Sequence, residues 1–202
     1  LITQAGTGTD QIGRFDLEID TDSNSIQNFT WKSIPITAEH CPRDTAMEEI
    51  LGRYKSVAEE KYARVVTRLK RPLTHPSWYQ ETELGGFLAD ILQESLRLDL
   101  MLVGSGSIRV NELGPIILFS NLTECLPYDD SAIAVWVTGA QLRKMILYML
   151  RDEVWNGAHC EFFQFSEGVR IVYNRKTHDF EEFSLHAEPI DDQRIYKIGL
   201  QY

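Results

Sequence analysis

The sequence has no long apolar run and little positive charge. None of its hydrophobic stretches approaches the roughly twenty residues that a helix needs to cross a bilayer, so we predict no membrane span. Its 20 lysines and arginines are outnumbered by 30 aspartates and glutamates, which gives a formal net charge of -10. Such a field repels polyanions, and no cluster of basic residues with interleaved aromatic residues offsets it. We therefore expect no nucleic acid among the partners of this chain.

Cysteine is scarce and follows no pattern. Cys41, Cys125 and Cys160 are an odd number without CxxC spacing, so the sequence predicts free thiols rather than a disulfide framework. A metal site divided between His40-Cys41 and His159-Cys160 is the alternative, but adjacent residues rarely point the same way. Unpaired thiols fit a reducing compartment.

Catalytic motifs are also missing. The sequence contains no P-loop, no HExxH, no GxSxG and no dinucleotide-binding glycine pattern followed by a helix. Its five histidines stand singly, without the spacing of metal ligands: His40, His75, His159, His178 and His186. We predict no catalytic residue and no metal or other cofactor in this stretch of chain.

What is present is a globular composition. The 202 residues are 43% hydrophobic and 25% charged, which is enough for one large domain or two small ones with a substantial core.

One stretch, from Glu81 to Arg109, organises the rest. Apolar residues at three- and four-residue steps predict a helix over residues 82–97, and the unbroken run Leu100–Val103 predicts a buried strand. The small residues Gly104–Ser107 then form a loop that Arg109 closes. Free amides in such a loop can form an anion-binding nest beside the arginine; an ordinary flexible turn with a solvated arginine is the alternative.

Helical and strand patterns on both sides of this stretch complete the expected fold. Alternation up to about Thr37, with a turn at Thr21–Asn24, predicts a β-hairpin, and Asp44 is placed to cap a helix that ends near Arg64. The capping-box spacing of Thr138 and Gln141 predicts a helix ending near residues 155–157. Further elements are a strand at 65–66, a short helix ending near 126, a strand at 133–137, and four strands after residue 161. Mixed helices and strands of this kind predict an α/β or α+β domain with a layered mixed sheet.

Four ordered motifs resemble one family. The stretches Glu81–Leu92, Leu100–Arg109, Leu126–Tyr128 and Val137–Leu142 are similar, in that order, to the C-terminal domain of the 5'-nucleotidase family. The resemblance covers about residues 65–202. Gln4–Gly6 with Ile12–Arg14 more weakly resembles the last strands of the family's N-terminal metallophosphoesterase domain.

The resemblance implies a domain plan. Residues 1–42 would end the N-terminal domain, residues 43–64 would form a linker helix between the domains, and residues 65–202 would form a C-terminal substrate-binding domain. The chain would then be a fragment, cut at both ends. The resemblance places two divalent metal ions in the missing N-terminal domain, which is also the expected partner within the same protein.

The resemblance also implies a nucleoside or nucleotide pocket. Arg109 matches the arginine that ends the family's asparagine-glycine-glycine-isoleucine-arginine loop, and Tyr128 matches one aromatic half of its base-stacking clamp. Gly104, Ser105 and Gly106 form the loop that lets the ligand come close. The other half of the clamp would lie beyond residue 202.

The sequence departs from the family pattern at several positions. Gly104 replaces the loop asparagine, Trp78 replaces an arginine three residues before the motif glutamate, and Gly85-Gly86 replaces a Gly-Asn pair. The usual Ser-Gly of a later strand reads Ser166-Glu167-Gly168.

Two functions follow. The first is the substrate-binding part of a metal-dependent 5'-nucleotidase-type phosphohydrolase, which removes phosphate from nucleotides. The alternative is a divergent, non-catalytic interaction domain that has lost nucleotide binding. Aspartate-x-histidine, asparagine-histidine and glycine-histidine-x-histidine motifs upstream would favour the first. The family's members are mostly exported to the periplasm or cell surface, whereas the thiols fit the cytoplasm, so the compartment stays open.

Overall fold

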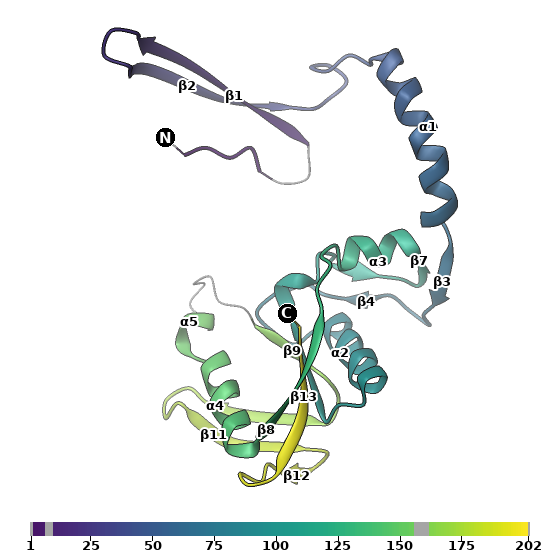
Figure 1. Cartoon of the computed structure of the whole chain (residues 1–202), viewed down its shortest axis with the longest axis vertical. Helices are drawn as coiled ribbons and strands as arrows, with labels where there is room; N and C mark the ends of the chain where they lie inside the picture. The colour runs from purple at the N-terminus through teal and green to yellow at the C-terminus, as the bar shows by residue number, and fades with distance from the viewer. Residues whose placement is uncertain (1, 7–9, 156–161, 202) are drawn as a thin grey trace. The chain divides into compact units, whose positions relative to one another are not determined.

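The computed structural model describes residues 2–6, 10–155 and 162–201 (Figure 1). The chain divides into two compact units, Leu1–Ala58 and Glu59–Tyr202, and the division falls inside one helix. That helix is the one that the sequence predicts as a linker. No helix in the part of the chain that the structure describes is long and apolar enough to cross a membrane.

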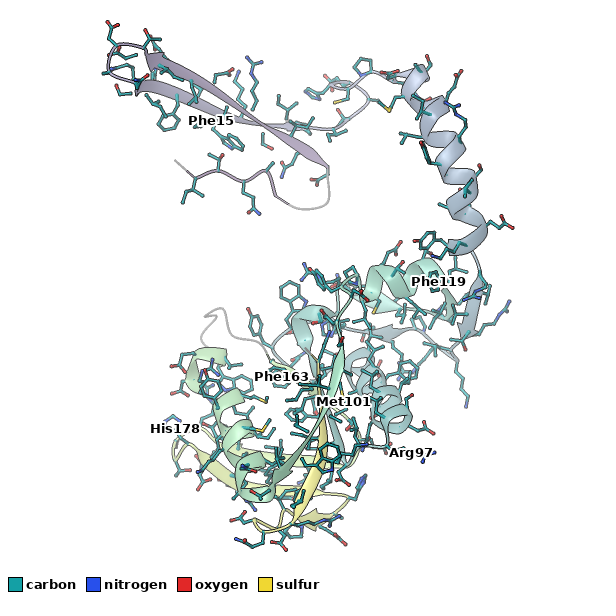
Figure 2. All side chains as sticks on the ribbon, in the orientation of Figure 1. Phe15, Arg97, Met101, Phe119, Phe163 and His178 are labelled. Atoms are coloured by element: carbon teal, nitrogen blue, oxygen red, sulfur yellow. The ribbon has the colours of Figure 1, made fainter. Side chains whose placement is uncertain are left out.

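The first unit contains the predicted hairpin. β1 (Gln11–Asp20) pairs with the antiparallel β2 (Ser25–Pro35). Asn24 has a φ of 51° in the tight turn between them, where asparagine is better tolerated than most residues. Phe15 packs against Phe29 and Trp31 of the opposite strand, with ring centroids 5.7 and 5.8 Å apart (Figure 2). Cross-strand aromatic contacts of this kind stabilise the hairpin register.

The helix α1 (Thr45–Tyr62) follows, as predicted. Asp44 caps it, because its carboxylate accepts a hydrogen bond of 3.0 Å from the amide of Met47. None of its residues is buried. The helix therefore exposes its apolar stripe: Met47, Ile50, Leu51, Tyr54 and Val57.

The second unit is built on a mixed four-stranded sheet. Its strand order is β8 (Ala132–Thr138), β13 (Ile195–Gln201), β5 (Leu100–Gly104) and β9 (Phe163–Phe165). β5 runs parallel to β13, whereas β8 and β9 are antiparallel to their neighbours. The strand that was predicted as buried, β5, is thus paired on both sides and is buried along its whole length.

Alternation along β5 divides the core between the two faces of this sheet. Met101 and Val103 pack with Ala89 of the helix α2 (Glu83–Leu96) on one face. Leu100 and Leu102 face the opposite layer, which consists of the helix α4 (Gly139–Met149) and a small sheet of β10 (Val169–Asn174), β11 (Asp179–Leu185) and β12 (Glu188–Pro189). The fold is therefore the layered mixed-sheet domain that the sequence predicts (Figure 1).

Two details differ from the prediction. The helix that begins after Thr138 ends at Met149 and is followed by a separate helix α5 (Asp152–Trp155), because the carbonyl of Leu150 accepts a hydrogen bond from the Trp155 indole instead of continuing the helical ladder. After residue 161 the described residues form five strands rather than the predicted four, because Glu188–Pro189 pair with β11 as the short strand β12.

Short elements close the side of the domain near the N-terminus of α2. β3 (Val65–Arg68) pairs with β7 (Ile116–Leu118), and β4 (Leu73–Thr74) pairs with β6 (Glu112–Leu113). The helix α3 (Phe119–Cys125) follows β7. A second apolar cluster lies among them: Leu84, Ile108, Leu113, Ile117 and Cys125.

Candidate functional site

The predicted loop begins where the buried strand β5 ends. Ser105–Ser107 form a single 3-10 turn after Gly104. The amide of Gly104 donates to Oε1 of Gln201 at 3.2 Å, and the amide of Ser105 donates to the carbonyl of Phe162 at 2.9 Å. These two amides already have acceptors, so Gly104 and Ser105 do not form the anion-binding nest that was one of the two alternatives for this loop.

A buried glutamine holds this loop against the start of α2. The Gln164 side chain is fully buried and donates from Nε2 to the Ser105 hydroxyl at 2.8 Å and to the Gln80 carbonyl at 2.9 Å. Its Oε1 accepts from the Thr82 amide at 2.9 Å. Thr82 is itself the N-cap of α2, since its hydroxyl accepts from the Gly85 amide at 3.1 Å. One side chain thus joins β9, the loop and the helix start.

His75 extends this polar network. Nε2 lies 3.1 Å from the Ser105 carbonyl, and Nδ1 lies 2.8 Å from the Thr82 hydroxyl. A carbonyl only accepts, so Nε2 carries the proton and Nδ1 accepts from Thr82 in the neutral ring. Desolvation lowers the pKa of His75 below its ordinary value of 6.5, against a smaller opposing effect of the hydrogen bond to Ser105. The histidine is therefore neutral at pH 7 and fixes the loop.

Arg109 lies on the exposed side of the loop. Its guanidinium donates to the carbonyl of Gly106 at 3.1 Å, and its Cζ lies 5.2 Å from the centroid of the Trp78 ring. Such a cation–π contact restricts a long side chain and keeps its remaining donors available. The exposed arginine therefore has two partners within the protein, and in the loop Ser105 is buried and Gly106 is half-buried.

Tyr128 follows the helix α3, as the sequence predicts. The backbone amide of Arg109 donates to the carbonyl of Cys125 at 2.8 Å, which ties the loop to the segment that leads to Tyr128. The phenol ring is 55% exposed and is free to stack on a ligand. The structure thus brings the backbones of the predicted arginine and tyrosine segments into one neighbourhood.

Metal-binding chemistry is not assembled in the described residues. Among them, no three His, Cys, Asp or Glu side chains converge on a point where they could hold a metal ion. Cys41 and Cys125 are free thiols, as predicted. Cys160 and the histidine before it lie outside the described residues, so the alternative of a divided metal site stays open.

Sequence reasoning missed the residues that hold the loop. Gln164 and His75 lie 59 and 30 positions from Ser105, and no local pattern links them. The signal for Gln164 was a polar residue among apolar neighbours in a strand, which is a position where a buried side chain needs partners. For Trp78, the departure from the family pattern was visible, but its contact with Arg109 was not.

Comparison with known families agrees with the predicted family and with the layered fold. The sequence model of the family described as "5'-nucleotidase, C-terminal domain" matches residues 62–201. The chain belongs to this family. The match begins at the end of α1 and runs through the layered domain.

Two curated relatives come from Bacillus subtilis (strain 168). The chain is 26% identical over 147 residues to the "Uncharacterized metallophosphoesterase YunD", covering 71% of this chain and 30% of that protein. It is 26% identical over 150 residues to "Endonuclease YhcR", covering 72% of this chain and 12% of that protein. The chain therefore spans less than a third of the length of either relative.

Solved structures share the fold. A 5'-nucleotidase precursor from Thermus thermophilus has a TM-score of 0.67 and 17% identity, over 95% of this chain and 40% of that one. A putative 5'-nucleotidase from Staphylococcus aureus has a TM-score of 0.69 and 12% identity, over 95% of this chain and 41% of that one. Both are larger proteins with a region that matches this fold.

Proposed function

We propose that this 5'-nucleotidase C-terminal domain is the substrate-binding part of a metal-dependent phosphohydrolase that removes phosphate from nucleotides. In this proposal, Arg109 contacts a polar or anionic oxygen of the ligand and Tyr128 stacks on the base. Gly104, Ser105 and Gly106 shape the floor of the site. The observation that supports it most is the fixed placement of Arg109 over Trp78, at the rim of a loop that Gln164 and His75 hold rigid.

The metals belong to a different part of the protein in this proposal. An N-terminal metallophosphoesterase domain would bind two divalent ions, which would activate water and neutralise the phosphoryl group. Residues 1–42 would be the end of that domain, residues 43–64 the linker helix and residues 65–202 the substrate-binding domain. The exposed apolar stripe of α1 supports a partner surface on the linker. The upstream metal-binding motifs named above are the simplest test of this plan.

An interaction domain without nucleotide binding is the second candidate. Two features favour it. Gly104 lacks the side-chain amide of the asparagine that it replaces, and Arg109 already contacts Trp78 and Gly106 within the protein. The two candidates differ in whether a nucleoside reaches Arg109.

Adenosine titration into the 202-residue chain distinguishes them. The indole N–H signal of Trp78 should shift, with a dissociation constant in roughly the millimolar range, because a single arginine and a single aromatic ring offset little of the cost of immobilising a ligand. Arg109→Ala should weaken binding about tenfold or more. Lys144→Ala, an exposed change on α4, is the matched control and should leave binding unchanged. A Trp78 signal that does not respond to adenosine would favour the interaction domain.

Catalysis gives a separate test. The 202-residue chain alone should not hydrolyse AMP with divalent manganese, because the described residues assemble no metal site. Turnover by the pure chain that is lost on mutating its own residues would contradict the two-domain proposal.

A further inference from the structure

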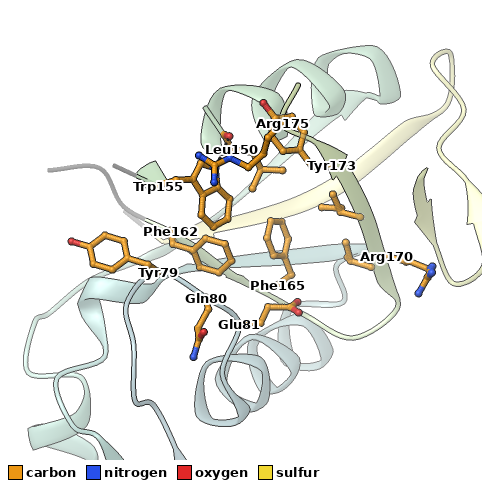
Figure 3. A pocket seen from close by; sticks show the side chains of 12 residues that line it. Tyr79, Gln80, Glu81, Leu150, Trp155, Phe162, Phe165, Arg170, Tyr173 and Arg175 are labelled. Atoms are coloured by element: carbon orange, nitrogen blue, oxygen red, sulfur yellow. Dashed lines mark hydrogen bonds between the residues drawn. The ribbon is translucent and has the colours of Figure 1, made fainter. Parts of the chain in front are cut away.

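A hollow lies on the side of the domain where α5 and β10 meet the segment before α2, and Arg109 is not among the residues that line it. It has a volume of about 510 Å³, which is within the range of small-molecule sites. Figure 3 shows Phe162 and Phe165 in its middle, Trp155 and Arg175 on one side, and Gln80 and Glu81 on the other. None of the five residues predicted from the sequence lines it.

Aromatic rings form a fixed wall in this hollow. Trp155 meets Phe162 at a centroid distance of 6.0 Å and an interplanar angle of 61°, and Phe162 meets Phe165 at 6.4 Å and 80°. The Trp155 indole is anchored because its Nε1 donates to the Leu150 carbonyl at 2.9 Å. Phe162 and Phe165 are also nearly buried, at 7% and 9% exposure, so these rings are already fixed and little ordering is lost when a flat ligand enters.

The two arginines that line the hollow differ in whether they already form an ion pair. Arg170 is already paired, since its Nε lies 2.7 Å from Oε2 of Glu182. Arg175 has its Cζ 5.7 Å from the centroid of the Trp155 ring and forms no ion pair or hydrogen bond with any residue that the structure describes. Glu81 contributes a carboxylate on the opposite side. One guanidinium is thus available beside an aromatic wall, and a negative group faces it.

We propose that this hollow is a binding site for a planar aromatic monoanion, specifically an aryl carboxylate. The ring of the ligand lies among Trp155, Phe162 and Phe165, and its carboxylate pairs with Arg175, whose planar fork matches two carboxylate oxygens. A polyanion is disfavoured because, among the described residues that line the hollow, one cation is without an ion pair, Glu81 repels a second negative charge, and the chain carries a net charge of -10. A neutral ring would leave Arg175 without its partner.

The four tryptophans of the chain allow a site-specific test. Indole-3-acetate is titrated into the 202-residue chain while the indole N–H signals are followed by NMR, with the Trp155 signal assigned from Trp155→Phe. The Trp155 signal should shift with saturation, whereas those of Trp31, Trp78 and Trp136 should not, since none of them lines the hollow. No shift at Trp155, or equal shifts at all four signals, would overturn the proposal.

Charge specificity is tested with a neutral ligand and a matched pair of variants. The wild-type chain should bind indole-3-acetamide about tenfold more weakly than indole-3-acetate. Arg175→Gln should bind indole-3-acetate about tenfold more weakly than the wild type does, because each change removes the charge-assisted pair. Lys176→Gln removes the neighbouring cation of the same turn, which does not line the hollow, and should leave the affinity unchanged. Unchanged affinity in Arg175→Gln, with the other indole signals in their native positions, would overturn the role of Arg175. Tighter binding of AMP than of indole-3-acetate at Trp155 would overturn the assignment to a monoanion.

Discussion

The guanidinium carbon of Arg109 lies 5.2 Å from the centre of the Trp78 ring. This contact joins Arg109, which matches the family's loop arginine, to Trp78, which is one of the positions that depart from the family pattern. Relative to the arginine of the family pattern, a tryptophan at position 78 makes the candidate site less basic and gives Arg109 a flat surface to contact.

This contact can be tested by shortening the tryptophan. Trp78→Ala should weaken adenosine binding about two- to fivefold, because an exposed cation–π contact contributes about 0.5–1 kcal/mol to holding Arg109. Trp78→Phe should recover part of the loss. Trp136→Ala is the control, since that indole is 68% exposed on the edge strand β8. Isothermal titration of each variant gives the comparison, and equal affinity in wild type and Trp78→Ala would show that Arg109 needs no such support.

The two glycines of α2 should respond in opposite ways to the same change. A Cβ at Gly85 would collide with the Gln164 side chain, whereas a Cβ at Gly86 meets only the Phe165 carbonyl at 4.0 Å. Gly85→Ala should therefore lower the free energy of unfolding by about 1–3 kcal/mol, because the buried network must shift. Gly86→Ala should raise it by about 0.5–1 kcal/mol through better helix propensity. Urea unfolding measures both, and a stabilising Gly85→Ala would contradict the close packing described for Gln164.

Stability should fall between neutral and mildly acidic pH because of His75. Burial lowers the pKa of this imidazole below 6.5 in the folded chain, so the unfolded chain binds the proton more readily. The stabilising effect is complete above pH 6.5 and is lost as the pH falls below that value. Urea unfolding of wild type at pH 7.5 and about pH 5.5 should show this loss, and His75→Gln should show a smaller one.

His186 provides the control for the pH series. It is exposed and has a φ of 50°, a conformation that asparagine also tolerates. His186→Asn should keep the pH dependence of the wild type. If the free energy of unfolding changed equally with pH in His75→Gln and in wild type, His75 would not be the group that titrates.

The thiols should differ in reactivity while the chain is folded. Burial raises the pKa of Cys125 to about 11, so only about one molecule in a thousand carries the thiolate at pH 8. Cys41 is half-buried and should be alkylated by iodoacetamide well before Cys125. Mass spectrometry of peptides over time measures the two rates. In denaturant, all three cysteines should titrate as free thiols, and a count of one would indicate a disulfide.

Local pattern in the sequence determined the main elements of this protein. The apolar steps of α2, the buried run of β5, the hairpin turn and the capping box of Thr138 and Gln141 all lie where the sequence predicts them. Each depends on residues only a few positions apart, so the physical cause is already present in the printed sequence. The four ordered family motifs predicted the fold of the domain as a whole.

Only the tertiary structure decided which distant side chains meet. The order of the sheet inserts β13, the last strand, between β8 and β5, and it places Gln164 of β9 against Ser105 and Thr82. The contact of Trp78 with Arg109 and the aromatic hollow around Phe162 arise in the same way. Such contacts depend on non-local strand pairing and on the burial of polar groups that then need partners, and no spacing along the chain encodes them.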